Sequence, residues 1–107
     1  MIRVVYHRGY YKLNIDGHAQ SGDAGHDLVC AAASILAYTL AANVLELEAM
    51  GHVRDMSIDL DPGQAEIKCC PRTRFKAPIQ MIYDSICAGF ALLAQQYQDN
   101  ISYEILG

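Results

Sequence analysis

Residues 26–50 read HDLVCAAASILAYTLAANVLELEAM, and this stretch decides the fold. Alanine, the best helix former, fills much of it, Asp27 suits the positive end of a helix dipole, and Gly51 is typical just after a helix end. The stretch therefore predicts one long helix. Apolar residues surround most of this helix, because they occur at Val29, Leu36, Leu40, Val44 and Leu47 and also at Leu28, Ile35 and Leu45. A sheet can cover only one side of such a helix, so a second helix or a second subunit must cover the rest.

Two hairpin patterns accompany the helix. Residues 2–8 are rich in β-branched and aromatic types and residues 10–15 alternate apolar with polar, with Arg8-Gly9 as a turn between them. Downstream of the helix, residues 53–60 and 64–70 form a second hairpin pattern around the strong turn signal Asp61-Pro62-Gly63. We therefore expect four strands in two hairpins.

A second helix and a last strand complete the pattern. Pro78 suits a first helical turn, Asn100 closes the helix, and residues 101–106 alternate as a strand. The helix carries one apolar stripe at steps of three and four, namely Ile79, Ile82, Ile86, Phe90, Leu93 and Tyr97. The expected order is ββαββαβ. It predicts an α+β fold, a single domain over residues 1–107 with a mostly antiparallel sheet and both helices packed on one face.

Charge and cysteine content narrow the class of protein. The 107 residues carry a formal net charge of -4, whereas a general nucleic-acid binder is usually basic, so we expect no direct nucleic-acid partner. No secretory signal precedes the first strand pattern, and no CxxC pair occurs. We therefore predict a cytoplasmic protein whose four cysteines, Cys30, Cys69, Cys70 and Cys87, are reduced thiols.

One apolar segment resembles a membrane span by length. Residues 28–45 are uncharged over 18 positions, the lower limit for a spanning helix. Ser34, Thr39 and Asn43 interrupt the run, and no basic cluster flanks it. We interpret it as a buried helix of a soluble protein and expect no membrane partner.

Candidate catalytic residues lie where the second strand leads into the first helix. His18 follows that strand, a glycine-rich segment with Gly22 and Gly25 comes next, and Cys30 lies in the first turns of the helix. A helix N-terminus favours a thiolate and offers N–H groups to an oxyanion, and a nearby histidine can take the thiol proton. Such a segment can fold over a bound peptide. The arrangement indicates a cysteine nucleophile, Cys30, with His18 as its base and Gly22 and Gly25 in a substrate loop.

Helical spacing adds two supporting residues. Asp27 lies three residues before Cys30 and Ser34 four after it, so all three share one helix face. Asp27 can orient His18 or simply stabilise the helix start. Ser34 can position the thiol or simply permit close packing.

Other interpretations of the same residues stay open. A single cysteine in an alanine-rich helix is usually a small core residue, and a histidine at a strand end is usually exposed. His18, His26 and Cys30 also make up three potential zinc ligands, although a zinc site normally has a fourth ligand and closer spacing. The pattern alone leaves catalysis, packing and metal binding as alternatives, and we predict no metal.

Two motifs together resemble a known family. Gly17-His18-Ala19 and the segment from Gly25 to Ser34, GHDLVCAAAS, are similar to the signature of the ribosomal-processing cysteine proteases called Prp. The resemblance implies a cysteine endopeptidase with Cys30 as nucleophile, His18 as its partner and Asp27 and Ser34 in support. It further implies a homodimer without a cofactor, in the cytoplasm. The implied substrate is a large-subunit ribosomal protein whose N-terminal extension is removed during ribosome assembly. A non-enzymatic, ribosome-associated binding module of the same fold is the alternative.

Overall fold

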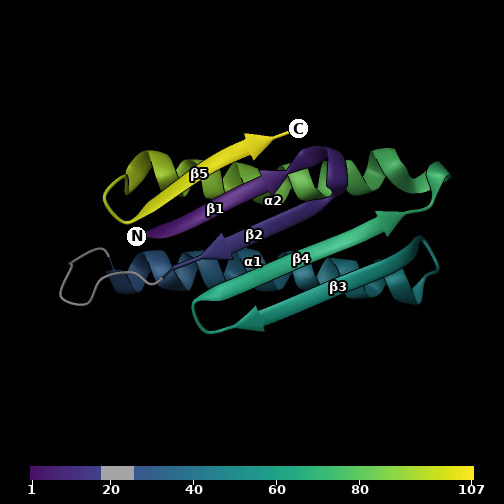
Figure 1. Cartoon of the computed structure of the whole chain (residues 1–107), viewed down its shortest axis with the longest axis horizontal. Coiled ribbons are helices and arrows are strands. Elements are labelled where there is room, and N and C mark those ends of the chain that lie inside the picture. Colours follow the sequence, from purple (N-terminus) through teal and green to yellow (C-terminus); the bar gives the residue numbers. More distant parts are fainter. Residues whose placement is uncertain (18–25) are drawn as a thin grey trace.

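A computed structural model describes residues 1–17 and 26–107, with only the backbone considered at His26 and Asp27. Within these residues five strands form one sheet in the order β3-β4-β2-β1-β5 (Figure 1). The strands are β1 (Ile2–His7), β2 (Lys12–Asp16), β3 (Val53–Asp61), β4 (Gln64–Pro71) and β5 (Ile101–Leu106). The predicted order ββαββαβ is confirmed, and so is the α+β class.

The sheet is mostly antiparallel, as predicted. Three of its neighbouring pairs are antiparallel, and only β1 and β5 run parallel. That parallel pair brings the first and last strands side by side, because the second helix carries the chain back along the sheet before β5 begins (Figure 1). Ile2 N–H donates to the Asn100 carbonyl over 2.9 Å at the start of this pair.

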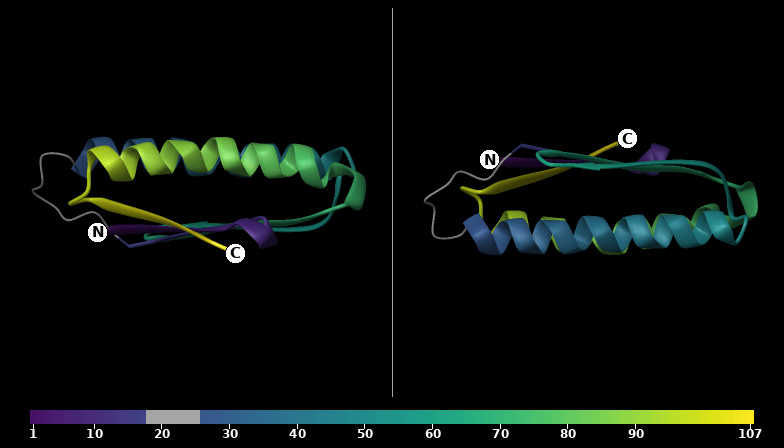
Figure 2. Two further views of the ribbon diagram at one scale, coloured as in Figure 1. Left: turned by 90° about the horizontal axis from the view of Figure 1, so that it is seen from above. Right: turned by 90° about the horizontal axis from the view of Figure 1, so that it is seen from below.

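Both helices lie on the same face of the sheet, which leaves the other face uncovered in the described chain (Figure 2). They are α1 (His26–Ala49) and α2 (Lys76–Gln96). Helix α1 begins at the predicted residue and ends one residue before the predicted Met50. Helix α2 places Pro78 in its first turn, where a missing N–H costs nothing, as predicted.

Some boundaries differ from the expectation. The first hairpin contains a 3-10 turn, Arg8–Tyr10, followed by Tyr11 in the left-handed conformation, so β2 begins at Lys12 rather than Tyr10. Helix α2 ends at Gln96 instead of continuing to Asn100, which is buried and donates its N–H to the Tyr97 carbonyl. Both differences lie at the ends of elements. Tight-turn hydrogen bonds decide those ends, and they have no period that a sequence pattern reveals.

The core lies between the sheet and the helices. Leu13 of β2 is paired with Tyr6 on one side and Ile67 on the other, so one row of buried side chains crosses three strands. Val29, Leu40 and Val44 of α1 and Ile79, Tyr83 and Phe90 of α2 pack into the same cluster. Tyr6 and Tyr83 stack with ring centroids 6.0 Å apart. This core fixes α1 along its length and hence the position of Cys30.

The side of α1 that faces away from the sheet is also apolar. Leu28, Ile35 and Leu45 are 51–62% exposed there. By length and composition alone, the segments Leu28–Ala49 and Thr73–Gln96 are apolar enough to cross a membrane, a test that the core helices of soluble proteins also pass. The second helix thus covers only part of the apolar girth that the sequence predicted.

Candidate active site

Cys30 is the fifth residue of α1, directly after the four residues whose backbone N–H groups have no carbonyl partner within the helix. It follows the fully buried Val29, and Ala33 one turn later is buried too. Its own side chain is half-buried and packs against the edge of the core. The sulfur is therefore held in place by a rigid helix at the end where the dipole is positive.

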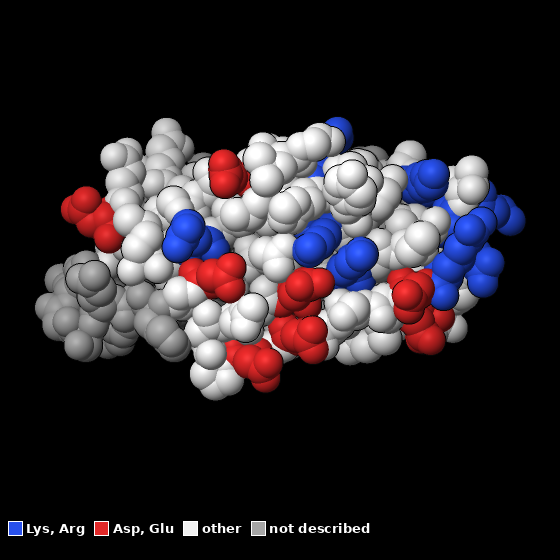
Figure 3. Space-filling view, viewed as in Figure 1, with Lys and Arg blue, Asp and Glu red and all other residues white. Residues whose placement is uncertain are grey.

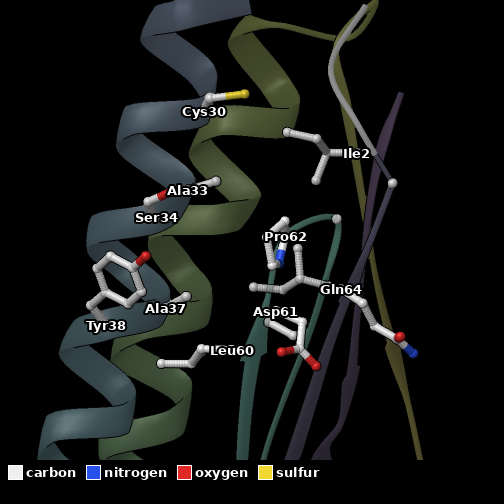
Figure 4. A pocket seen from close by; sticks show the side chains of 14 residues that line it. Ile2, Cys30, Ala33, Ser34, Ala37, Tyr38, Leu60, Asp61, Pro62 and Gln64 are labelled. Atoms are coloured by element: carbon white, nitrogen blue, oxygen red, sulfur yellow. The ribbon is translucent and has the colours of Figure 1, made fainter.

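A pocket of about 460 Å³ opens beside Cys30 (Figure 4). One wall is α1, which contributes Cys30, Ala33, Ser34, Ala37 and Tyr38. The opposite wall is the β3–β4 turn with its flanks, residues 60–65. Ile2, Ile15 and Gly17 close the end of the pocket where β1 begins and β2 ends. The mostly apolar lining suits an extended peptide with apolar side chains.

Ser34 lies on the pocket wall one helical turn beyond Cys30, so the structure brings these two predicted residues to the same cavity. Asp27 lies on the same helix, but its side chain is outside the described part of the structure. His18, Gly22 and Gly25 also lie outside the described residues. Their predicted roles stay predictions.

The other cysteines have different surroundings. Cys69 and Cys87 are buried in the core. Burial raises the pKa of the Cys69 thiol, and it raises the pKa of the Cys87 thiol to about 12, so both stay protonated and unreactive at neutral pH. Cys70 is exposed on the opposite face of β4, as adjacent strand residues are expected to be. Cys30 is the one among these four thiols that lines the pocket.

The described residues contain no group of three or more His, Cys, Asp or Glu side chains placed to hold a metal ion. The zinc hypothesis rested on His18, His26 and Cys30, and the first two side chains are not described. Metal analysis of the purified protein therefore tests the zinc hypothesis.

Sequence patterns missed the far wall of the pocket. The turn Asp61-Pro62-Gly63 was predicted, and β3 and β4 do pair around it. Its place opposite Cys30 depends on the strand order β3-β4-β2, which sets the hairpin beside β2 and across from α1. No local sequence pattern predicts this strand order.

Comparisons with known proteins identify the family. The model of the family described as cysteine protease Prp matches residues 1–102. The chain belongs to this family. A relative named ribosomal processing cysteine protease Prp, from Staphylococcus aureus (strain Mu50), is 28% identical over 87 residues, which are 81% of this chain and 78% of the relative. The predicted family and cysteine protease activity are confirmed.

Solved structures share the fold. The crystal structure of an essential ribosomal processing protease Prp from S. aureus, in complex with a substrate peptide, superimposes with a TM-score of 0.71 at 20% identity, covering 98% of this chain and 97% of that one. SMU.848 from Streptococcus mutans gives 0.68 at 24% identity, covering 98% and 91%. The element order and the helix-on-sheet arrangement are thus those of known Prp structures.

Proposed function

We propose that this protein is a cytoplasmic cysteine endopeptidase that removes the N-terminal extension of a large-subunit ribosomal protein during ribosome assembly. Residues 1–107 act as a single protease domain. The observation that carries the proposal is the half-buried Cys30 thiol in the second turn of α1, on the wall of a peptide-sized pocket. The name of the S. aureus relative, which is a ribosomal processing protease, supports the substrate class.

In the proposed reaction the Cys30 thiolate attacks the scissile carbonyl carbon while His18 holds the thiol proton. The negative oxygen of the tetrahedral intermediate accepts hydrogen bonds from N–H groups at the start of α1. His18 then gives its proton to the leaving amine, and a thioester to Cys30 remains. Water attacks this thioester, and His18 takes one water proton and returns it to sulfur. The product leaves as a carboxylic acid, which gives its remaining proton to solvent and becomes a carboxylate.

Supporting roles follow from position. Asp27 would orient His18 or hold its positive charge, and Ser34 would position the thiol from the next helical turn. Gly22 and Gly25 remain the predicted substrate-loop residues. No cofactor takes part in these steps.

The surface charge suits a basic substrate. Asp59, Asp61 and Glu66 lie on the β3–β4 hairpin at the pocket end of the sheet, whereas many Lys and Arg side chains gather at the opposite end (Figure 3). The carboxylates of this hairpin, of which Asp61 lines the pocket, attract a positively charged protein and repel nucleic acid phosphate. We therefore propose a protein substrate and no direct nucleic-acid partner.

Peptide cleavage tests the function. A synthetic peptide that carries the N-terminal extension of the host's ribosomal protein is incubated with wild type, Cys30→Ala and the matched control Cys70→Ala, and products are measured by mass spectrometry. We expect cleavage by wild type and Cys70→Ala and none by Cys30→Ala. Equal cleavage by Cys30→Ala would refute the nucleophile, and no cleavage by any of the three would favour the binding-module alternative. Metal analysis of protein purified without chelator tests the zinc hypothesis.

We also propose a homodimer, formed through the outer face of the helix layer. Leu28, Ile35 and Leu45 of α1 and Met81 and Leu92 of α2 are more than half exposed, and water-exposed apolar area of this kind is typical of an interface. Wild type should elute with twice the 11.8 kDa chain mass in light scattering. Ile35→Glu should be monomeric, while Ile105→Glu, a control at an exposed position on β5, should not. A monomeric wild type would contradict the proposal.

A further inference from the structure

The β3–β4 turn contacts the root of the segment that carries His18. The backbone N–H of Gly17, the residue before His18, donates to the Gly63 carbonyl over 2.9 Å. This bond joins positions 46 residues apart in sequence, and both residues line the Cys30 pocket. The turn therefore also holds the residue that follows β2, in addition to connecting β3 and β4.

Gly17 is restrained from a second side as well. Its φ is +108°, a backbone conformation that residues with a Cβ rarely adopt. A Cβ added there would lie 2.3 Å from the Met1 carbonyl oxygen. Gly17 thus fits closely between the start of β1 and the turn, and only a glycine fits in this conformation.

These restraints fix the position of Gly17, the residue before His18. Consecutive Cα atoms are about 3.8 Å apart across a trans peptide, so the position of Gly17 limits the position of the next residue. Cys30 is placed independently, by the packing of α1 on the core. Gly17 and Cys30 are therefore held by different parts of the molecule.

We infer that the β3–β4 turn is a positioning element for catalysis, in which the Gly63 carbonyl holds Gly17, the residue to which the proposed base His18 is joined. The inference rests on the proposed His18–Cys30 pair. Gly63 itself has φ +78°, so its own conformation depends on the absence of a Cβ. A substitution at Gly63 that alters the direction of its carbonyl leaves the identities of Cys30 and His18 unchanged.

The test compares two glycines with similar backbone conformations. Gly63→Val and Gly51→Val both place a β-branched residue at a positive φ, +78° and +74°, which strains either site. Gly51 follows the far end of α1, about 30 Å along the helix from Cys30 by the rise per residue, and a Cβ there meets no atom within 4 Å. Gly63→Asn serves as the conservative variant, because asparagine tolerates a positive φ.

The readout is alkylation of Cys30 by iodoacetamide at pH 6 without substrate, in a Cys70→Ala background that removes the exposed second thiol. A histidine that holds the thiol proton keeps the sulfur as thiolate, the form that reacts. The reagent is too small to need the far wall of the pocket, so lost substrate contacts do not affect the rate. Displacing catalytic groups by about 1 Å commonly costs up to about 100-fold, so we expect Gly63→Val to react at least about 10-fold more slowly. Gly51→Val and Gly63→Asn should stay within about two-fold of the background.

His18→Ala separates the two hypotheses. If His18→Ala and Gly63→Val are both slow and Gly51→Val is not, the inference is supported. If His18→Ala is slow while Gly63→Val matches Gly51→Val, the positioning role is wrong and the catalytic pair stands. If His18→Ala reacts as fast as the background, the proposed pair itself fails. Gly63→Ala and Gly51→Ala, which carry less strain, replace the valine variants if thermal unfolding shows that either is not folded at the assay temperature.

Discussion

Gly17→Ala should be among the most destabilising single-methyl additions in this protein. The new methyl would lie 2.3 Å from the Met1 carbonyl oxygen, whereas ordinary contacts begin near 3.4 Å, so the backbone must move by about 1 Å. Both partners are held by backbone hydrogen bonds of 2.9 Å, from Gly17 to Gly63 and from Ile2 to Asn100. Neither side can move without weakening one of these bonds.

The magnitude follows from two contributions. A residue with a Cβ held at a rarely populated φ costs about 1–3 kcal/mol, and a lost backbone hydrogen bond costs about 0.5–1.5 kcal/mol. The free energy of unfolding should therefore fall by roughly 2–4 kcal/mol, or roughly 10–20 °C in Tm for a domain of this size. Gly51→Ala carries only the conformational cost, about 1 kcal/mol, because its Cβ meets no atom within 4 Å.

Urea unfolding followed by circular dichroism measures both variants, at one protein concentration because a dimer's stability depends on concentration. A lower midpoint with an unchanged slope reports a change in the native state. Equal losses for Gly17→Ala and Gly51→Ala would refute the reasoning, since the clash with Met1 would then contribute nothing.

Two further predictions concern contacts of α2. The Arg8 guanidinium and the Tyr6 hydroxyl donate to the Asp84 carboxylate, which holds the pKa of Asp84 below its usual 3.8. The unfolded carboxyl therefore binds its proton at a higher pH than the folded one, so this stabilisation is present above about pH 4 and lost as the pH falls through the lower folded value. At pH 7, urea unfolding should find Asp84→Asn less stable than wild type by about 1 kcal/mol, a value typical of a largely exposed ion pair. The difference in free energy of unfolding should shrink toward pH 2, and a difference that stays constant with pH would contradict the prediction. Gly89→Ala should raise the free energy of unfolding by about 1 kcal/mol, through helix propensity, only in a Leu36→Ala background. In the wild-type background the new methyl would lie 2.8 Å from Leu36 Cδ2, and this contact offsets the gain. An equal gain in both backgrounds, measured by urea unfolding, would show that Leu36 moves aside.

Periodic patterns predicted the elements of this fold well. The three- and four-residue stripe of α2 and the alternation of residues 101–106 correctly predicted a helix and a strand. The stripe is only partly the buried face of α2, because that face consists of Ile79, Tyr83, Cys87 and Phe90. Boundaries were less predictable where side chains or tight turns decide them. Tyr11 adopts a left-handed conformation after the 3-10 turn, an outcome that alternating polarity does not reveal.

The candidate site was predictable only in its local half. Cys30 and Ser34 share a helix face, and helical spacing alone places them together. The opposite wall, with Pro62 and Gly63, comes from a hairpin whose strands reach the pocket through the strand order. The bond from Gly17 to Gly63 is equally invisible, because it joins two backbones and depends on no side chain.

The two halves of the proposed catalytic pair differ in how they are coupled to stability. Cys30 is flanked by Val29 and Ala33, both buried, so substitutions that shift the thiol also open or overfill the core and cost stability. His18 follows a glycine restrained by one hydrogen bond and one close backbone contact at the end of the central strand β2. Changes at the β3–β4 turn can therefore alter the geometry of the pair while most of the core stays intact. Variants of this turn should separate activity from folding, whereas variants that move Cys30 should not.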